Sequence, residues 1–177
     1  MMSKENGKWK IAKYVAVIFL TIIIHREKCI SATAVDNAPK YGRVTNLPIP
    51  RFTSIKSSKV LMRVGAGYDY PVFKSYSCIN MPVQVLDEFK QWRKVLDYEK
   101  NIGWIHESLL SSNKTAKVTS SKASLRYFPS YQFPKIGMLK NGSIVKILKR
   151  KNAWCKIAIN EIKGWVEEDH LWGINKK

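Results

Sequence analysis

The stretch SSKVLMR at residues 57–63 returns as SSKASLR at residues 120–126, 63 positions further along the chain. Tyr68 and Pro71 are repeated at the same spacing by Tyr131 and Pro134. Self-similarity at a fixed period identifies the folding unit of a chain. The sequence therefore predicts one structural unit of about sixty residues that occurs twice.

The spacing between the two copies shortens toward their C-terminal ends. WRKV at residues 92–95 corresponds to WCKI at 154–157, 62 positions later, and GWI at 103–105 corresponds to GWV at 164–166, 61 positions later. Single-residue deletions of this kind are tolerated best in turns that connect strands. The changes in offset thus predict turns between the matched segments.

Both copies consist of short runs of β-forming residues between turns, and no apolar run has helical spacing. In the first copy we expect strands at residues 61–64, 72–75, 83–88, 92–96 and 103–106. In the second we expect them at residues 124–126, 135–139, 144–149, 154–159 and 162–166. Five short strands do not form a stable open sheet, so we expect an all-β fold in which each copy closes into a small barrel. The expected domains are residues 51–112, the first repeat, and residues 113–177, the second repeat.

The first 34 residues have the three parts of a secretory signal peptide. Lys4, Lys8 and Lys10 precede an apolar run at residues 14–24, and Ala32-Thr33-Ala34 offers a cleavage site. That run is too short to cross a hydrocarbon core about 30 Å thick. We expect export, cleavage after Ala34, and an extended linker over the proline-containing residues 35–50. Charged residues at 25–28 leave an uncleaved N-terminal anchor as the alternative.

The whole chain has a net charge of +18, and residues 35–177 keep 25 basic and 11 acidic side chains. Such a charge favours polyanionic partners, which include anionic lipids, glycan phosphates, peptidoglycan carboxylates and nucleic acids. A basic surface that is simply solvated is the alternative interpretation.

Catalysis finds little support in the residues. No metal-spaced His/Cys cluster, phosphate-binding glycine loop or Gly-x-Ser-x-Gly elbow is present, so we predict no cofactor, no metal and no enzymatic activity. His106 and His170 each lie near the end of a repeat, which suggests equivalent structural roles. A Cys155–His170 nucleophile pair is an alternative, but Cys155 alternates in phase with Ile157 and is expected to be a free thiol in the core. Export would also permit a disulfide between Cys155 and Cys78.

Three features resemble the bacterial SH3-like (SH3b) domain family of secreted and cell-wall proteins. The first is MRVGAGYDYP at residues 62–71, an apolar residue and Arg followed by a glycine-containing turn and an aromatic–Pro pair. The others are the Trp-x-Lys strand and the closing Gly-Trp-Ile or Gly-Trp-Val strand of each repeat. The resemblance covers residues 51–173 and looks like a tandem, exported proteobacterial subfamily. It implies two SH3-like barrels, each with a ligand groove.

The resemblance also implies which residues form the groove. Strand periodicity puts Trp92 and Lys94 on the face opposite Val95, and in SH3-like barrels this outer face borders the groove. The groove residues expected in the first repeat are Tyr68, Tyr70, Trp92, Lys94 and Trp104. Their counterparts in the second repeat are Tyr131, Phe133, Trp154, Lys156 and Trp165. Rings beside lysines bind extended peptides or sugars, and the alternative is that these rings only cap the barrels or fill the space between them.

The two repeats differ in the loop that leads into the aromatic–Pro pair. Gly65 and Gly67 allow a tight turn in the first repeat, which Phe128-Pro129-Ser130 is not expected to copy. We therefore expect the working groove in the first repeat. The function expected from the sequence is an exported, non-enzymatic protein that binds peptidoglycan peptide or an envelope protein. The alternative is a polyanion-binding protein, and a nucleic-acid partner is disfavoured by export.

Overall fold

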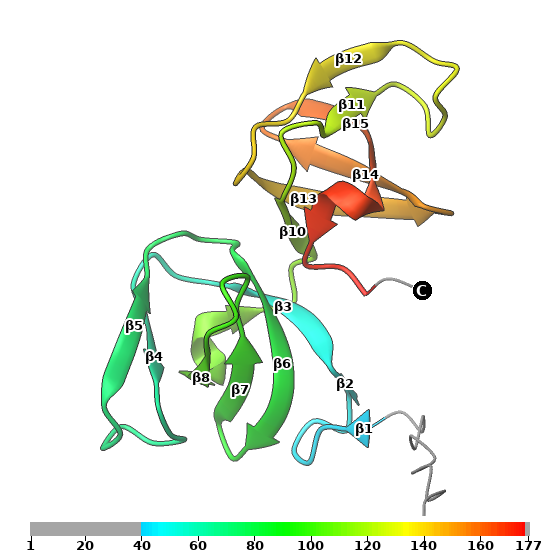
Figure 1. Cartoon of the computed structure of the whole chain (residues 1–177). Coiled ribbons are helices and arrows are strands. Elements are labelled where there is room, and N and C mark those ends of the chain that lie inside the picture. The colour runs from blue at the N-terminus through cyan, green and yellow to red at the C-terminus, as the bar shows by residue number, and fades with distance from the viewer. Residues whose placement is uncertain (1–39, 176–177) are drawn as a thin grey trace, which may run out of the picture. The chain divides into compact units, whose positions relative to one another are not determined.

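The computed structural model describes residues 40–175, and the predicted signal peptide at residues 1–34 lies outside the described residues. The described chain is built from β-strands and two single-turn 3-10 helices (Figure 1), which confirms the all-β prediction. Across residues 40–175, no helix has the length and apolar character that crossing a bilayer requires.

The first repeat forms a seven-stranded antiparallel sheet in the order β5-β4-β8-β7-β6-β3-β9. A 3-10 helix, Glu107–Leu109, precedes the last strand. The strands are β3 (Arg51–Ile55), β4 (Val60–Arg63), β5 (Val72–Tyr76), β6 (Pro82–Phe89), β7 (Trp92–Leu96), β8 (Ile102–His106) and β9 (Leu110–Ser111).

The second repeat forms a sheet in the order β12-β11-β15-β14-β13-β10-β16, which is the same order with each strand replaced by its counterpart. Its 3-10 helix is Glu168–His170. The strands are β10 (Thr115–Val118), β11 (Ser124–Arg126), β12 (Lys135–Met138), β13 (Ile144–Lys151), β14 (Trp154–Ile159), β15 (Ile162–Glu167) and β16 (Leu171–Trp172).

The two sheets share even their irregularities. The register shifts between Met62 and Arg63 in β4 and between Leu125 and Arg126 in β11. A second shift lies in β6 between Val85 and Asp87, and its counterpart lies in β13 between Ile147 and Lys149. Bulges bend a strand and re-aim its side chains. The repeat in the sequence is therefore a repeat of one scaffold, bulges included.

The expected closure of each barrel is wrong. The strand order of each sheet is open, with β5 and β9 at the two ends of the first and β12 and β16 at the two ends of the second. β9 and β16 have only two residues each. β9 pairs with β3, and β16 pairs with β10. Within the described residues, neither pairs with the strand at the other end of its sheet. Curvature of the sheet around a core therefore replaces closure.

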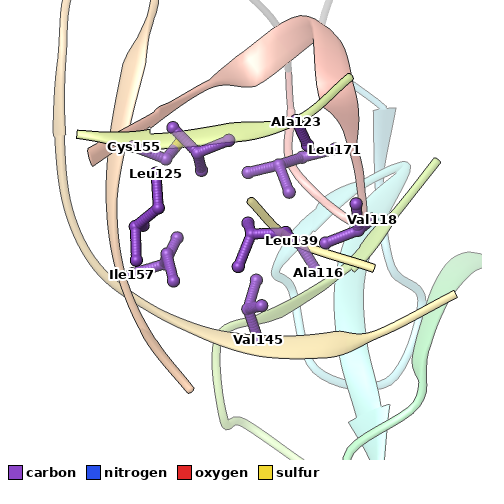
Figure 2. Packing of buried hydrophobic residues seen from close by; sticks show 10 residues of the cluster. Ala116, Val118, Ala123, Leu125, Leu139, Val145, Cys155, Ile157 and Leu171 are labelled. Atoms are coloured by element: carbon purple, nitrogen blue, oxygen red, sulfur yellow. The ribbon is translucent and has the colours of Figure 1, made fainter. Parts of the chain in front are cut away.

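Each sheet encloses its own apolar core. The buried residues of the first include Val60, Met62, Val85, Val95 and Ile105. Those of the second, drawn in Figure 2, are Ala116, Val118, Ala123, Leu125, Leu139, Val145, Cys155, Ile157, Val166 and Leu171. Cys155 and Cys78 are both free, so the expected buried free thiol is confirmed and the disulfide is not formed.

Residues 40–49 fold back on themselves where an extended linker was expected. β1 (Lys40–Tyr41) pairs with β2 (Pro48–Ile49), and Ile49 is 5% exposed within the first core. The turn between them closes over the fully buried carboxylate of Glu88, which accepts hydrogen bonds from Val44 N and Thr45 N at 3.0 and 2.8 Å. A side chain at Gly42 would collide with that carboxylate, because an added Cβ would lie 2.4 Å from Glu88 Cδ. Glycine thus permits the contact that orders this segment.

Candidate functional site

A hollow of about 220 Å³ lies on the outer face of the first sheet, where β4, β7 and β8 meet the loop between β4 and β5. We call it the first-repeat groove. It is lined by Lys59, Leu61, Arg63, Tyr68, Trp92, His106 and Leu109.

Strand register brings the aromatic side chains of this groove together. Trp92 opens β7 and lies directly opposite His106 at the end of β8. Directly opposite residues of antiparallel strands share one face, and the two rings meet edge to face at 5.4 Å between centroids. Tyr68 lies edge-on to Trp92 at 5.1 Å and stacks on His106 at 5.8 Å. Trp92 is therefore on the outer face, but the residue is only 7% exposed.

Arg63 fixes the loop that carries Tyr68. Its Nη1 donates hydrogen bonds to the backbone carbonyls of Tyr68, at 2.9 Å, and Tyr70, at 2.7 Å. Its guanidinium also lies 5.7 Å from the centroid of the Tyr68 ring, within range of a cation–π contact. One arginine thus sets both the path of the loop and the position of its exposed ring.

His106 adds an oriented polar group to the groove. It caps the 3-10 helix, and its Nδ1 accepts a hydrogen bond from the backbone N–H of Ser108 at 3.3 Å. An imidazole that accepts at Nδ1 carries its proton on Nε2 when neutral. The groove therefore combines two aromatic rings, a ring N–H donor and the cationic side chains of Lys59 and Arg63.

The second repeat reproduces the loop and the ring pair. Arg126 Nη1 donates to the carbonyls of Tyr131 and Phe133, at 3.2 and 2.5 Å. Tyr131 lies edge-on to Trp154 at 5.2 Å. The loop backbones also match, since Gly67 N donates to Gly65 O in the first and Ser130 N donates to Phe128 O in the second.

The prediction that Phe128-Pro129-Ser130 could not copy the turn of the first repeat is therefore wrong. Neither Gly65 nor Gly67 is among the described residues with a positive φ. Gly65 instead makes room for the Tyr70 ring, since an added Cβ would lie 2.4 Å from it. In the second repeat Phe128 occupies that position and packs against Phe133 at 4.6 Å between centroids.

The two grooves differ in charge at one position. His106 is matched by Glu167, not by His170, because the offset near the end of the repeats is 61 residues. The Tyr131 hydroxyl donates a hydrogen bond to Glu167 Oε2, which raises the pKa of the tyrosine. The expected equivalence of His106 and His170 is thus wrong: His106 caps its 3-10 helix, whereas His170 is the last residue of the other.

The remaining residues predicted for the grooves lie elsewhere on the same scaffold. Trp104 is directly opposite both Arg63 and Lys94, in a row beside the groove, and neither Trp104 nor Lys94 lines it. Trp165 holds the equivalent position opposite Arg126 and Lys156 and is 9% exposed. Tyr70 lies over Gly65.

The sequence prediction of the groove missed five of its lining residues: Lys59, Leu61, Arg63, His106 and Leu109. His106 could have been found from strand periodicity, because it lies two residues beyond Trp104. Leu109 carried no such signal, since it lies in the 3-10 helix.

Cys155 lies in the second core with no exposed surface (Figure 2), and burial raises the pKa of its thiol. A buried neutral thiol is a poor nucleophile. His170 is the other member of the alternative nucleophile pair, and its imidazole lies 3.9 Å from the Glu167 carboxylate.

Comparison with known proteins identifies the class of these domains. Residues 56–112 and residues 121–171 each match a family model described as a bacterial SH3 domain. The chain therefore carries two bacterial SH3 domains in tandem, as the resemblance predicted.

A Bacillus subtilis protein, YrvJ, which bears the name of an N-acetylmuramoyl-L-alanine amidase, is 26% identical to this chain over 128 residues. The match covers 62% of this chain and 24% of YrvJ, so this chain spans about a quarter of that relative's length. Among solved structures, NlpC2 from Trichomonas vaginalis has a TM-score of 0.32 at 15% identity, covering 70% of this chain and 48% of that one. An NlpC/P60 family protein from Bacillus cereus has a TM-score of 0.31 at 14% identity, covering 68% and 55%.

Proposed function

We propose that this protein is an exported, non-enzymatic binding protein of the bacterial cell envelope, and that its first-repeat groove holds an extended peptide of the cell wall. Two bacterial SH3 domains and a relative named for a cell-wall amidase point to cell-wall-related binding and to an extracellular or periplasmic location. The alternative partner for the same groove is an envelope protein that presents an exposed extended segment.

The observation that carries the proposal is the groove formed by Tyr68, Trp92 and His106. Tyrosine and tryptophan supply rigid contact area at low entropic cost, and Leu61 and Leu109 add apolar walls. Lys59 and Arg63 supply positive charge that suits a carboxylate, and peptidoglycan peptides carry carboxylates. An extended peptide that presents an acidic group beside an apolar side chain fits this set.

The test is retention of residues 35–177 on purified cell-wall sacculi. Tyr68→Ala removes a ring that is 68% exposed, so it costs little stability, and we expect binding to fall roughly tenfold, as for a contact worth about 1.4 kcal/mol. Tyr131→Ala is the matched control, because Tyr131 is 66% exposed and holds the same place in the second repeat. Thermal midpoints of both variants should stay near that of the parent protein. Equal losses for the two variants would remove the first-repeat groove as the binding site.

Two further measurements separate this proposal from its alternatives. Retention on DNA-cellulose at matched salt, without retention on sacculi, would support a nucleic-acid-binding protein instead. Release of soluble fragments from sacculi would show a hydrolase, and we expect none because the Cys155 thiol is buried.

A further inference from the structure

A cluster of lysines covers the outer face of the second sheet. Strand register places Lys149, Lys156 and Trp165 directly opposite one another across β13, β14 and β15. It also places Lys146 and Lys163 on either side of Ala158. Side chains that oppose each other in this way share one face of a sheet, and Lys151 joins them two residues beyond Lys149. We call this set the lysine face: Lys146, Lys149, Lys151, Lys156 and Lys163.

The scaffold does not require these lysines. The first repeat has the same strands and the same bulge, but its corresponding residues are Gln84, Asp87, Phe89, Lys94 and Ile102. One lysine and one aspartate there replace five lysines here. Because the two sheets fold alike, the lysines serve something other than the fold.

The second repeat also carries more net positive charge than the first. Residues 113–177 hold 14 basic and four acidic side chains, a net charge of +10, whereas residues 51–112 hold nine basic and six acidic ones, a net charge of +3. Lys146, Lys149, Lys151 and Lys163 are exposed and Lys156 is half-buried. The carboxylate that register places on this face is Glu167, and it already accepts a hydrogen bond from Tyr131. The face thus presents a strong positive potential to solvent.

The shape of the face decides which polyanion it fits. Its ammonium groups are spread both along the strands, at about 3.3 Å per residue, and across them, at about 4.8 Å per strand. A linear polymer is matched by a line of charges, whereas a two-dimensional array matches a surface of anionic groups. Trp154 and Trp165 lie on the same face but are only 8% and 9% exposed, so their rings offer little area for stacking on nucleic-acid bases. Leu148, at the bulge beside Lys149, is 43% exposed and adds an aliphatic side chain that can enter a lipid headgroup layer.

We infer that the lysine face binds the surface of a lipid bilayer rich in anionic headgroups. The second repeat would thus hold the protein to a membrane while the first-repeat groove holds its own ligand. The inference does not rest on the proposed function, because the two sites lie on different repeats and share no residue.

The experiment measures binding of residues 35–177 to vesicles. The N-terminal segment is removed because its apolar run would itself enter lipid. Residues 39–177 form a compact unit of their own, so the shortened protein keeps both repeats. Vesicles of equal parts phosphatidylglycerol and phosphatidylcholine are compared with vesicles of phosphatidylcholine alone, at about 0.1 M salt, where charges are screened beyond about 10 Å. We expect binding to the anionic vesicles only.

The decisive variant is Lys146→Gln/Lys149→Gln/Lys163→Gln, which removes three exposed charges. Each basic residue near an anionic surface strengthens binding roughly fivefold, so we expect a loss of roughly a hundredfold. The matched control is Lys114→Gln/Lys122→Gln/Lys140→Gln, which removes three exposed lysines of the same repeat that lie outside its strands, and we expect it to lose less than tenfold. Equal losses for the two triple variants, or no binding of the parent protein to anionic vesicles, would overturn the inference. Tighter binding to single-stranded DNA with the same dependence on the lysine face would assign the surface to nucleic acid instead.

Discussion

Glu88 shows how a single side chain can hold several segments of the first repeat. Its carboxylate has no exposed surface and accepts hydrogen bonds from Val44 N, Thr45 N and Thr45 Oγ1. Arg51 Nη2 donates to it at 2.7 Å, and Arg93 Nε lies 3.7 Å away. Burial alone would raise the pKa of Glu88, but the hydrogen bonds from Thr45, Arg51 and Val44 outweigh burial and lower it from 4.5 to about 2.

The lowered pKa of Glu88 makes the stability of the first repeat depend on pH. Because the pKa is lower in the folded than in the unfolded protein, the contribution of Glu88 is complete above about pH 4.5 and is lost as the pH falls toward about 2. Glu88→Gln leaves two arginines beside an uncharged amide, and we expect it to cost about 3 kcal/mol at neutral pH. Denaturant unfolding at several pH values measures both effects. Asp69→Asn, at an exposed position, is the control, and an equal loss for the two variants would contradict this role.

Side-chain phase was predictable from the sequence, whereas partners in space were not. Period-two alternation predicted that the side chains of Trp92 and Val95 point to different faces of the sheet, and Val95 is fully buried in the core. The same rule applied one strand later would have placed His106 beside Trp92. The contacts of Glu88 had no such signal, because they join residues 43 and 44 positions apart through a turn that looked like a linker.

At the level of elements, the Gly-Trp motif has a steric cause. Gly103 lies on the core side of β8, where an added Cβ would be 2.5 Å from Met62 Cγ and 2.8 Å from Arg63 O. Gly164 holds the same place in β15, 2.6 Å from Leu125 Cγ and 2.9 Å from Arg126 O. Glycine in a strand often marks a close approach of another backbone. Here it lets β8 and β15 pass close to β4 and β11.

Substitution of these glycines tests that explanation. We expect Gly103→Ala and Gly164→Ala each to lower the free energy of unfolding by about 1–3 kcal/mol through overpacking. Gly137→Ala in β12 is the matched control, since nothing lies within 4 Å of its added Cβ. Thermal unfolding measures all three. A loss at Gly137 as large as that at Gly103 would mean that strand flexibility, and not crowding, is the reason for glycine.

Three strands were predicted with their observed bounds, and two of them, β7 and β14, begin with tryptophan and contain β-branched residues. The strands expected at residues 92–96, 124–126 and 154–159 have those bounds in the structure. β1, β2, β9 and β16 were not predicted, because two residues are too few to show alternation. β3 and β10, of five and four residues, were also missed. Closure was predicted from the number of strands, but strand length decides whether the ends of a sheet can pair.

At the level of the whole molecule, duplication has produced two sheets of one design with different outer surfaces. Loop-fixing arginines and outward tryptophans are kept in both repeats, whereas four other outward positions carry lysine only in the second: Lys146, Lys149, Lys151 and Lys163. The proposed groove lies in the repeat of lower charge and the proposed lipid surface in the repeat of higher charge. Two weak sites on one chain can together link two large surfaces with high avidity.

This arrangement predicts that the protein tethers anionic vesicles to sacculi. Residues 35–177 should retain labelled vesicles on washed sacculi, and both Tyr68→Ala and the triple lysine-face variant should lower that retention. Each variant should keep the other activity, because the substitutions lie on different repeats. The readout is vesicle fluorescence in the sacculus pellet, alongside separate binding of each partner. A Tyr68→Ala protein that also lost vesicle binding would show that the two sites are not independent.

The open strand order has a consequence for how the protein behaves in concentrated solution. β12 ends its sheet, and all four of its residues are exposed, with Ile136 and Met138 on alternate positions. An unpaired strand edge is a template on which a second molecule can add a strand and begin an amyloid-like stack. Charge and glycine oppose such stacking, and β12 contains Lys135 and Gly137. At this edge, Lys135 and Gly137 are the residues that oppose the addition of a strand from a second molecule.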